Sequence, residues 1–108
     1  MKYTIEAMLT QLGYTINDSV KKQMENIINN TKNFMDIQKH IIQLNDALKP
    51  FQAYIAMSNS NNYLKIKNES PEESLKKVDE MIQEWAKKYK INLQKVENKE
   101  TYYILGKS

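Results

Sequence analysis

Apolar residues in the first half of the chain recur at helical spacing. The first such group comprises Ile5, Met8, Leu9 and Leu12. This spacing predicts a short helix over residues 3–12, and Gly13 follows where a left-handed residue commonly ends a helix. A second helical pattern begins at Asn17 or Asp18, each of which can accept a backbone N–H bond as a cap, and continues to Lys49 without Gly or Pro.

The second pattern contains apolar residues at every seventh position. These residues are Val20, Ile27, Phe34, Ile41 and Leu48. One structure that fits is a single helix over residues 18–48, about 45 Å long and suited to coiled-coil pairing. The other is a pair of helices separated at residues 29–31, an Asn-Asn-Thr triplet that favours helix ends. We favour the two helices, because Gln23 and Asn30 interrupt the seam in its first half.

Met35 and Ile42 form a second apolar strip on the helix predicted over residues 31–48. They lie about 120° around the helix from its main apolar face. A second apolar strip on a small protein indicates contact with another chain, and we expect a homodimer or a protein partner to cover it. The alternative is that the short helix over residues 3–12 covers these side chains.

After Pro50 the apolar period changes from that of a helix to that of a strand. The alternation predicts a β-hairpin over residues 51–67 with a polar tip at residues 58–62. Its apolar face contains Phe51, Ala53, Ile55, Met57, Leu64 and Ile66. Its outer face contains Gln52, Tyr54, Tyr63, Lys65 and Lys67.

The rest of the chain predicts one more helix and a second hairpin. Ser70 is the expected cap and Pro71 the first residue of a helix over residues 71–89. A hairpin follows over residues 91–96 and 101–105, and the apolar second strand suits the interior of a sheet. The predicted fold class is therefore α+β, a single domain over residues 1–108 in which helices precede a hairpin–helix–hairpin segment with a small antiparallel sheet.

Composition excludes several kinds of chemistry. The 108 residues contain no Cys, one His, two Gly and sixteen basic residues, all of which are Lys. Such a chain has no thiol nucleophile, no Gly-rich phosphate loop and no Arg to bind guanine or phosphate through two parallel hydrogen bonds. His40 has no second His, Cys or suitably placed carboxylate nearby in the sequence. We therefore expect no enzyme activity, no metal site and no cofactor.

The chain shows no signal for export or for a membrane. No apolar run approaches the roughly 20 residues that span a bilayer, and Cys is absent, so we expect a cytoplasmic protein without membrane contact. The net charge is +3, and basic residues concentrate after Lys87. Lysines that close a helix also stabilise its carboxyl end, which is the alternative explanation for part of this cluster. Abundant Lys, Asn and Ile without Arg suggest an AT-rich bacterial genome.

Lysines and tyrosines on the outer face of the first hairpin are the best candidates for binding nucleic acid. Lysines contact phosphates as point charges, and tyrosines stack on bases or donate to phosphate. The candidate residues are Tyr54, Asn59, Ser60, Asn61, Asn62, Tyr63, Lys65, Lys67, Lys88, Lys90, Lys95 and Lys99. The alternative is that Tyr and Lys simply form the solvated face of a half-exposed sheet.

Three helices followed by a two-stranded hairpin resemble the order of elements in winged helix-turn-helix DNA-binding domains. The segments that carry the resemblance are residues 3–12, 18–29, 31–48 and 51–67. The resemblance rests on this order and on no specific motif. It implies a recognition helix at residues 31–48 and a wing at residues 51–67. Because that helix is largely apolar, the hairpin with Lys65 and Lys67 is the better candidate for DNA contact.

The sequence thus leads to two functional hypotheses. The first is a small, non-enzymatic DNA-binding protein, a regulatory or accessory factor of a plasmid or phage, with DNA favoured over RNA and a homodimer expected. The alternative is an adaptor or chaperone-like module that engages another polypeptide through Met35 and Ile42 or through the edge of the sheet.

Overall fold

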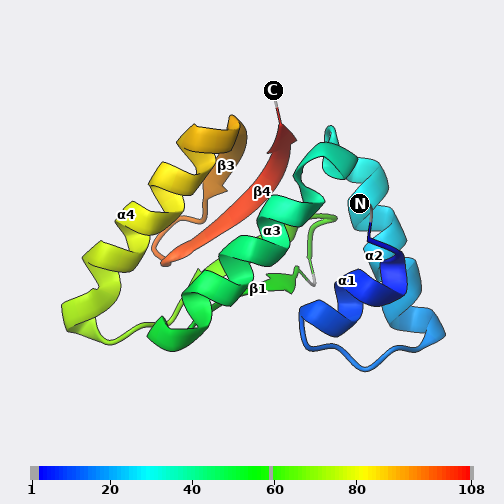
Figure 1. Cartoon of the computed structure of the whole chain (residues 1–108), viewed down its shortest axis with the longest axis horizontal. Coiled ribbons are helices and arrows are strands. Elements are labelled where there is room, and N and C mark those ends of the chain that lie inside the picture. Colours follow the sequence, from blue (N-terminus) through cyan, green and yellow to red (C-terminus); the bar gives the residue numbers. More distant parts are fainter. Residues whose placement is uncertain (1–2, 59, 108) are drawn as a thin grey trace.

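A computed structural model describes residues 3–58 and 60–107 and has an α+β fold in which the last two helices lie on one face of an antiparallel sheet and the first two lie beside it (Figure 1). The helices are α1 (Ile5–Gln11), α2 (Asp18–Asn30), α3 (Phe34–Leu48) and α4 (Glu72–Tyr89), with a 3₁₀ turn at Lys49–Phe51. The strands are β1 (Ala53–Met57), β2 (Leu64–Asn68), β3 (Ile91–Lys95) and β4 (Thr101–Lys107), in the spatial order β1-β2-β4-β3. The predicted fold class is confirmed, as is the interior position of β4.

The second helical pattern forms two helices, as favoured from the sequence. The helix α2 begins at a cap in which Asn17 Oδ1 accepts a bond from the Val20 N–H at 2.9 Å. After α2, Lys32 forms a short parallel bridge with the end of β4. The Lys32 N–H donates to the Leu105 carbonyl at 3.3 Å, and its carbonyl accepts from the Lys107 N–H at 2.9 Å. These bonds hold the backbone between the helices in an extended form.

Gly106 allows this bridge to form. Its backbone has a φ of +135°, and a Cβ atom there would lie 2.5 Å from the carbonyl oxygen of Lys32. Any other residue would push the two backbones apart, because real Cβ contacts are longer than this. Asn33 completes the junction with a left-handed φ of 56° and a bond from its side-chain amide to the Lys107 carbonyl at 3.0 Å.

The core lies between the sheet and the helices. Alternate residues of β1 and β2 (Ala53, Ile55, Met57, Leu64 and Ile66) are buried, as predicted for the apolar face of the first hairpin. They join Tyr102 and Ile104 of β4 and the buried faces of α3 and α4 in one apolar cluster. The helix α3 gives eight of its fifteen residues to the interior.

The beginning of the first hairpin and of α4 differ from the prediction. Phe51 lies in the 3₁₀ turn, and Gln52 has a left-handed φ of 62°, so the strand begins only at Ala53 and neither residue belongs to a face of the sheet. The predicted cap Ser70 is wrong by one residue, because α4 begins at Glu72 with Pro71 as its cap. Ser70 is buried, and its hydroxyl donates to Asn68 Oδ1.

Side chains from other elements accept hydrogen bonds along the outer edge of strand β1. Its outward N–H groups at Ile55 and Met57 donate to Asn45 Oδ1 at 2.9 Å and to the Tyr14 hydroxyl at 2.8 Å. An unpaired edge is a template for association with another strand, and these two bonds remove that template. The sheet therefore does not offer β1 as a docking edge.

We expect alanine substitutions at the two glycines to show how much close packing adds to the cost of backbone strain. Gly106→Ala should lower the free energy of unfolding by about 3 kcal/mol or more, because it adds a clash with Lys32 to the strain of a positive φ. Gly13→Ala, at a φ of +88° with no atom within 4 Å of the new Cβ, should cost only about 1 kcal/mol. Urea unfolding followed by circular dichroism measures both. Equal losses would contradict the close approach at Gly106.

Candidate nucleic-acid interface

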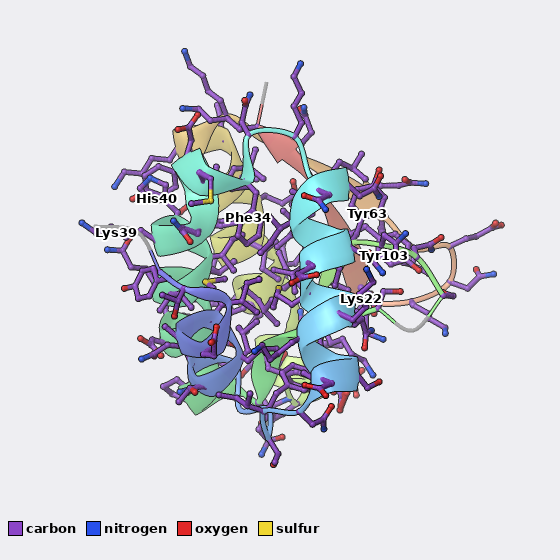
Figure 2. All side chains as sticks on the ribbon, turned by 90° about the vertical axis from the view of Figure 1, so that its right-hand side faces the viewer. Lys22, Phe34, Lys39, His40, Tyr63 and Tyr103 are labelled. Atoms are coloured by element: carbon purple, nitrogen blue, oxygen red, sulfur yellow. The ribbon has the colours of Figure 1, made fainter. Side chains whose placement is uncertain are left out.

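The face of the sheet away from α3 and α4 carries lysine and tyrosine side chains. In the register of the sheet, Lys65 of β2 pairs with Tyr103 of β4, and Lys67 pairs with Tyr54 of β1. These residues alternate with the buried ones, so their side chains point away from the core. Figure 2 shows Tyr63 and Tyr103 on the side of the molecule opposite His40 of α3. We call this surface the outer face of the sheet.

A hollow of about 580 Å³ runs along the outer face. It extends from the loop between β1 and β2, which we call the tip loop, to the turn between β3 and β4. Its polar and charged lining includes Ser58, Ser60, Lys65, Lys67, Glu69, Lys99, Glu100, Thr101 and Tyr103. The volume lies within the range of about 300–1,000 Å³ that is typical of small-ligand sites.

The tip loop is attached to α2. The side-chain amide of Gln23 donates to the Ser58 carbonyl at 2.9 Å, and that of Asn30 donates to the Asn62 carbonyl at 2.9 Å. Within the loop, Ser58 Oγ accepts bonds from the backbone N–H groups of Ser60 and Asn61 at 3.3 and 3.2 Å. The tip loop is therefore held against α2 at Ser58 and Asn62.

Tyr103 lies in the hollow in an environment that favours its ionised form. Hydrogen bonds from Asn61, Ser60 and Ser58 lower the pKa of its phenol below the usual 10, and the positive charge of Lys65 adds to the effect. The ring of Tyr63 lies next to it, with the two centroids 6.2 Å apart and a tilt of 39° between the planes. Two aromatic rings thus lie side by side at the tip-loop end of the outer face.

At the other end of the hollow, one carboxylate connects two of the predicted binding residues. Glu69 Oε1 accepts a hydrogen bond from the Tyr54 hydroxyl at 2.7 Å and forms an ion pair with Lys67 Nζ at 3.3 Å. The bond from Tyr54, followed by that from Lys67, lowers the pKa of Glu69, while the same carboxylate raises the pKa of both partners. Lys67 is therefore largely neutralised by Glu69, whereas Lys65 forms no ion pair among the described residues.

The structure brings only some of the predicted nucleic-acid-binding residues together. Those at the hollow or beside it are Tyr54, Ser60, Asn61, Tyr63, Lys65, Lys67 and Lys99, and Asn62 lies in the same tip loop. Asn59 lies outside the described residues. Lys88 lies on α4 in the helix layer, and Lys90 ends that helix with a left-handed φ of 58°. Lys95 pairs with Tyr102, whose side chain points to α4, so it belongs to the opposite face of the sheet.

Met35 and Ile42, the predicted partner-binding pair, have different surroundings. Ile42 is 5% exposed and belongs to the core, whereas Met35 is 45% exposed. The predicted second strip is therefore a single exposed methionine. His40 is half-buried, its ring stacks on Tyr89 at 3.6 Å, and its carbonyl accepts the indole N–H of Trp85 at 3.0 Å.

Tyr103 and Glu69 are the two important residues of the hollow that the sequence prediction missed. Tyr103 lay in a run that was apolar at every position, which gave no sign of which residues would face outward. Its register against Lys65 could have been found only by knowing that β4 pairs with β2. Glu69 lies two residues after Lys67, and this spacing was a usable signal for an ion pair.

No protein-family model, curated protein or solved structure matches this chain. Among the described residues, no three His, Cys, Asp or Glu side chains are placed to hold a metal ion. Within residues 3–58 and 60–107, every helix is too short or too polar to cross a membrane. The function therefore has to be inferred from the outer face itself.

Titration of the tyrosines tests the environment of the hollow. Burial and a bond to Asp79 raise the pKa of Tyr102 to about 12, whereas the pKa of Tyr103 is lowered. The ultraviolet absorbance of tyrosinate should therefore develop over a wide pH range. Tyr103→Phe should remove the earliest part of the change and Tyr102→Phe the latest, with circular dichroism showing that the protein stays folded. If the two variants lost absorbance over the same pH range, the opposite pKa shifts of Tyr102 and Tyr103 would be contradicted.

Proposed function

We propose that this protein is a non-enzymatic DNA-binding protein, a regulatory or accessory factor, and that the outer face of its sheet is the binding surface. The observation that carries the proposal is the hollow along β2 and β4, whose lining includes Lys65, Lys67, Lys99 and Tyr103. Lysines supply the charge that attracts phosphates, and most of the affinity of such proteins comes from this attraction. The net charge of +3 has the sign that this function requires.

The polar groups of the tip loop support the same proposal. Ser60, Asn61 and Asn62 are exposed beside the hollow, where they can donate to phosphate or base edges. The chain has no Arg, so contacts to DNA would come from Lys, Tyr, Ser and Asn. Such contacts position a nucleic acid with little dependence on sequence.

The alternative function, a protein–protein adaptor, is supported by a different surface. A second hollow of about 330 Å³ lies between α3 and α4, with Leu44, Ala47, Met81, Trp85 and Tyr89 in its lining. Apolar lining of this kind suits a polypeptide partner better than DNA. If the adaptor function is correct, the purified protein binds no DNA even at low salt.

Removal of lysines from the outer face should weaken DNA binding and its dependence on salt. The double variant Lys65→Gln with Lys99→Gln removes two phosphate contacts, and each contact contributes about 0.7–0.9 to the slope of log K against log salt. The matched control is Lys39→Gln with Lys87→Gln, which removes the same charge from exposed positions on α3 and α4. Fluorescence anisotropy with labelled DNA across a salt series should show lower affinity and a shallower slope in the first variant only. Equal effects from both variants would place the contacts elsewhere.

Replacement of Glu69 should strengthen binding. Glu69→Gln removes the charge that neutralises Lys67 but keeps an oxygen that can accept the Tyr54 hydroxyl. The freed ammonium group adds one phosphate contact, so affinity at low salt should rise and the slope should steepen by about 0.7–0.9. Glu80→Gln, at an exposed position on α4, is the control for loss of one negative charge. A steeper slope in both variants, or in neither, would show that Lys67 does not contact DNA.

A further inference from the structure

We infer that the outer face takes single-stranded DNA in preference to the duplex, with a base stacked on Tyr103 and the strand lying along the hollow. This inference rests on the proposed function and specifies the form of DNA that the same surface binds. It is carried by four features: the shape of the face, the attachment of the tip loop, the aromatic pair at the tip-loop end, and the lysines along the hollow.

The outer face is hollowed, and its ends are bordered by loops. Ser58 and Ser60 lie at one end, and Val96, Lys99 and Glu100 lie at the other. Reading the duplex requires an element that enters a groove, such as a helix or a two-stranded ribbon in the major groove. A hollow between two loops accepts a flexible single strand, whose bases are free to turn toward the protein.

The first hairpin is not free to act as the entering ribbon. Its strand β2 is paired on both sides, with β1 and with β4. Its tip loop is bonded to α2 through Gln23 and Asn30, more than thirty residues away in sequence. These bonds keep the hairpin from acting as a free two-stranded ribbon, whereas a strand that lies on the outer face leaves them intact.

The aromatic pair lies where an unpaired base can reach it. Tyr103 lines the hollow, and its ring is only partly covered by protein, with Tyr63 beside it. Aromatic side chains stack on any unpaired base, but a base inside a duplex has no free face for them. Its partly exposed ring is the part of Tyr103 that we expect a base to contact.

The lysines follow the same line as the hollow. Lys65 and Lys67 project from the same face of β2, about 7 Å apart along the strand. Lys99 lies beyond them at the β3–β4 turn. A single strand that passes Tyr103 and follows β2 would bring its phosphates to Lys65 and Lys99, while Lys67 between them is paired with Glu69. Lysines and stacking together, without Arg, are sufficient for binding that tolerates any sequence.

The experiment compares two forms of one DNA. A labelled mixed-sequence 20-mer is titrated with the 108-residue protein by fluorescence anisotropy, both as a single strand and annealed to its complement, at the same low salt. We expect at least tenfold tighter binding of the single strand. Tyr103→Leu, which keeps an apolar side chain but removes the ring, should weaken binding of the single strand about tenfold, as loss of one base–aromatic stack does. Tyr103→Phe, which keeps the ring, should bind within about twofold of the unmodified protein.

The outcomes separate the inference from the proposed function. If neither form binds, the proposed function is wrong. If the duplex binds as tightly as the single strand or more tightly, the proposed function stands and the inference about single strands is overturned. Equal affinities of the Leu and Phe variants for the single strand would also overturn it, because stacking on Tyr103 would then contribute nothing. Thermal unfolding of each variant checks that the sheet is intact.

Discussion

The structure depends on the backbone contact between Lys32 and Gly106. At this point the chain leaves α2, forms one parallel bridge with the last residues of β4, and then begins α3. The contact is possible because position 106 has no Cβ, and two backbone bonds together with one from Asn33 hold it. Residues far apart in the sequence are thereby joined, and the first two helices acquire a fixed relation to the sheet.

The position of α2 has a direct effect on the candidate site. Because α2 ends at the bridge, its side chains Gln23 and Asn30 lie beside the tip loop and bind its carbonyls. The loop in turn provides Ser58 and Ser60, which line the same hollow as Tyr103. Gln23 and Asn30 interrupted the apolar seam of the helix in the sequence. Their polarity is therefore explained by the loop they hold, and the break in the seam was a sign of this contact.

Local patterns predicted most of the elements, and long-range contacts account for most of what was missed. Helical spacing, the Asn17 cap, Gly13 and the period change after Pro50 each depend on residues near one another in sequence, and each was confirmed. The candidate site depends on pairing between strands. Lys65 meets Tyr103 only because β2 lies beside β4, and the sequence contains no signal for that order. Ile42 was assigned to a surface because its burial depends on neighbours that the helical pattern does not reveal.

The absence of Arg connects the composition to the geometry of the outer face. A surface that identifies a particular base pair commonly does so with planar groups that form two bonds at once, and Arg is the commonest of these. Lysine provides charge without that geometry, and tyrosine provides a ring that accepts any base. In this chain the lysines, the tyrosines and the polar tip loop lie on one hollowed face. One of these lysines, Lys67, forms an ion pair with Glu69. This combination favours binding of many different base sequences, together with a preference between single-stranded and duplex DNA. The chemistry of the residues and the shape of the face therefore both favour the single-stranded DNA that we infer as the ligand.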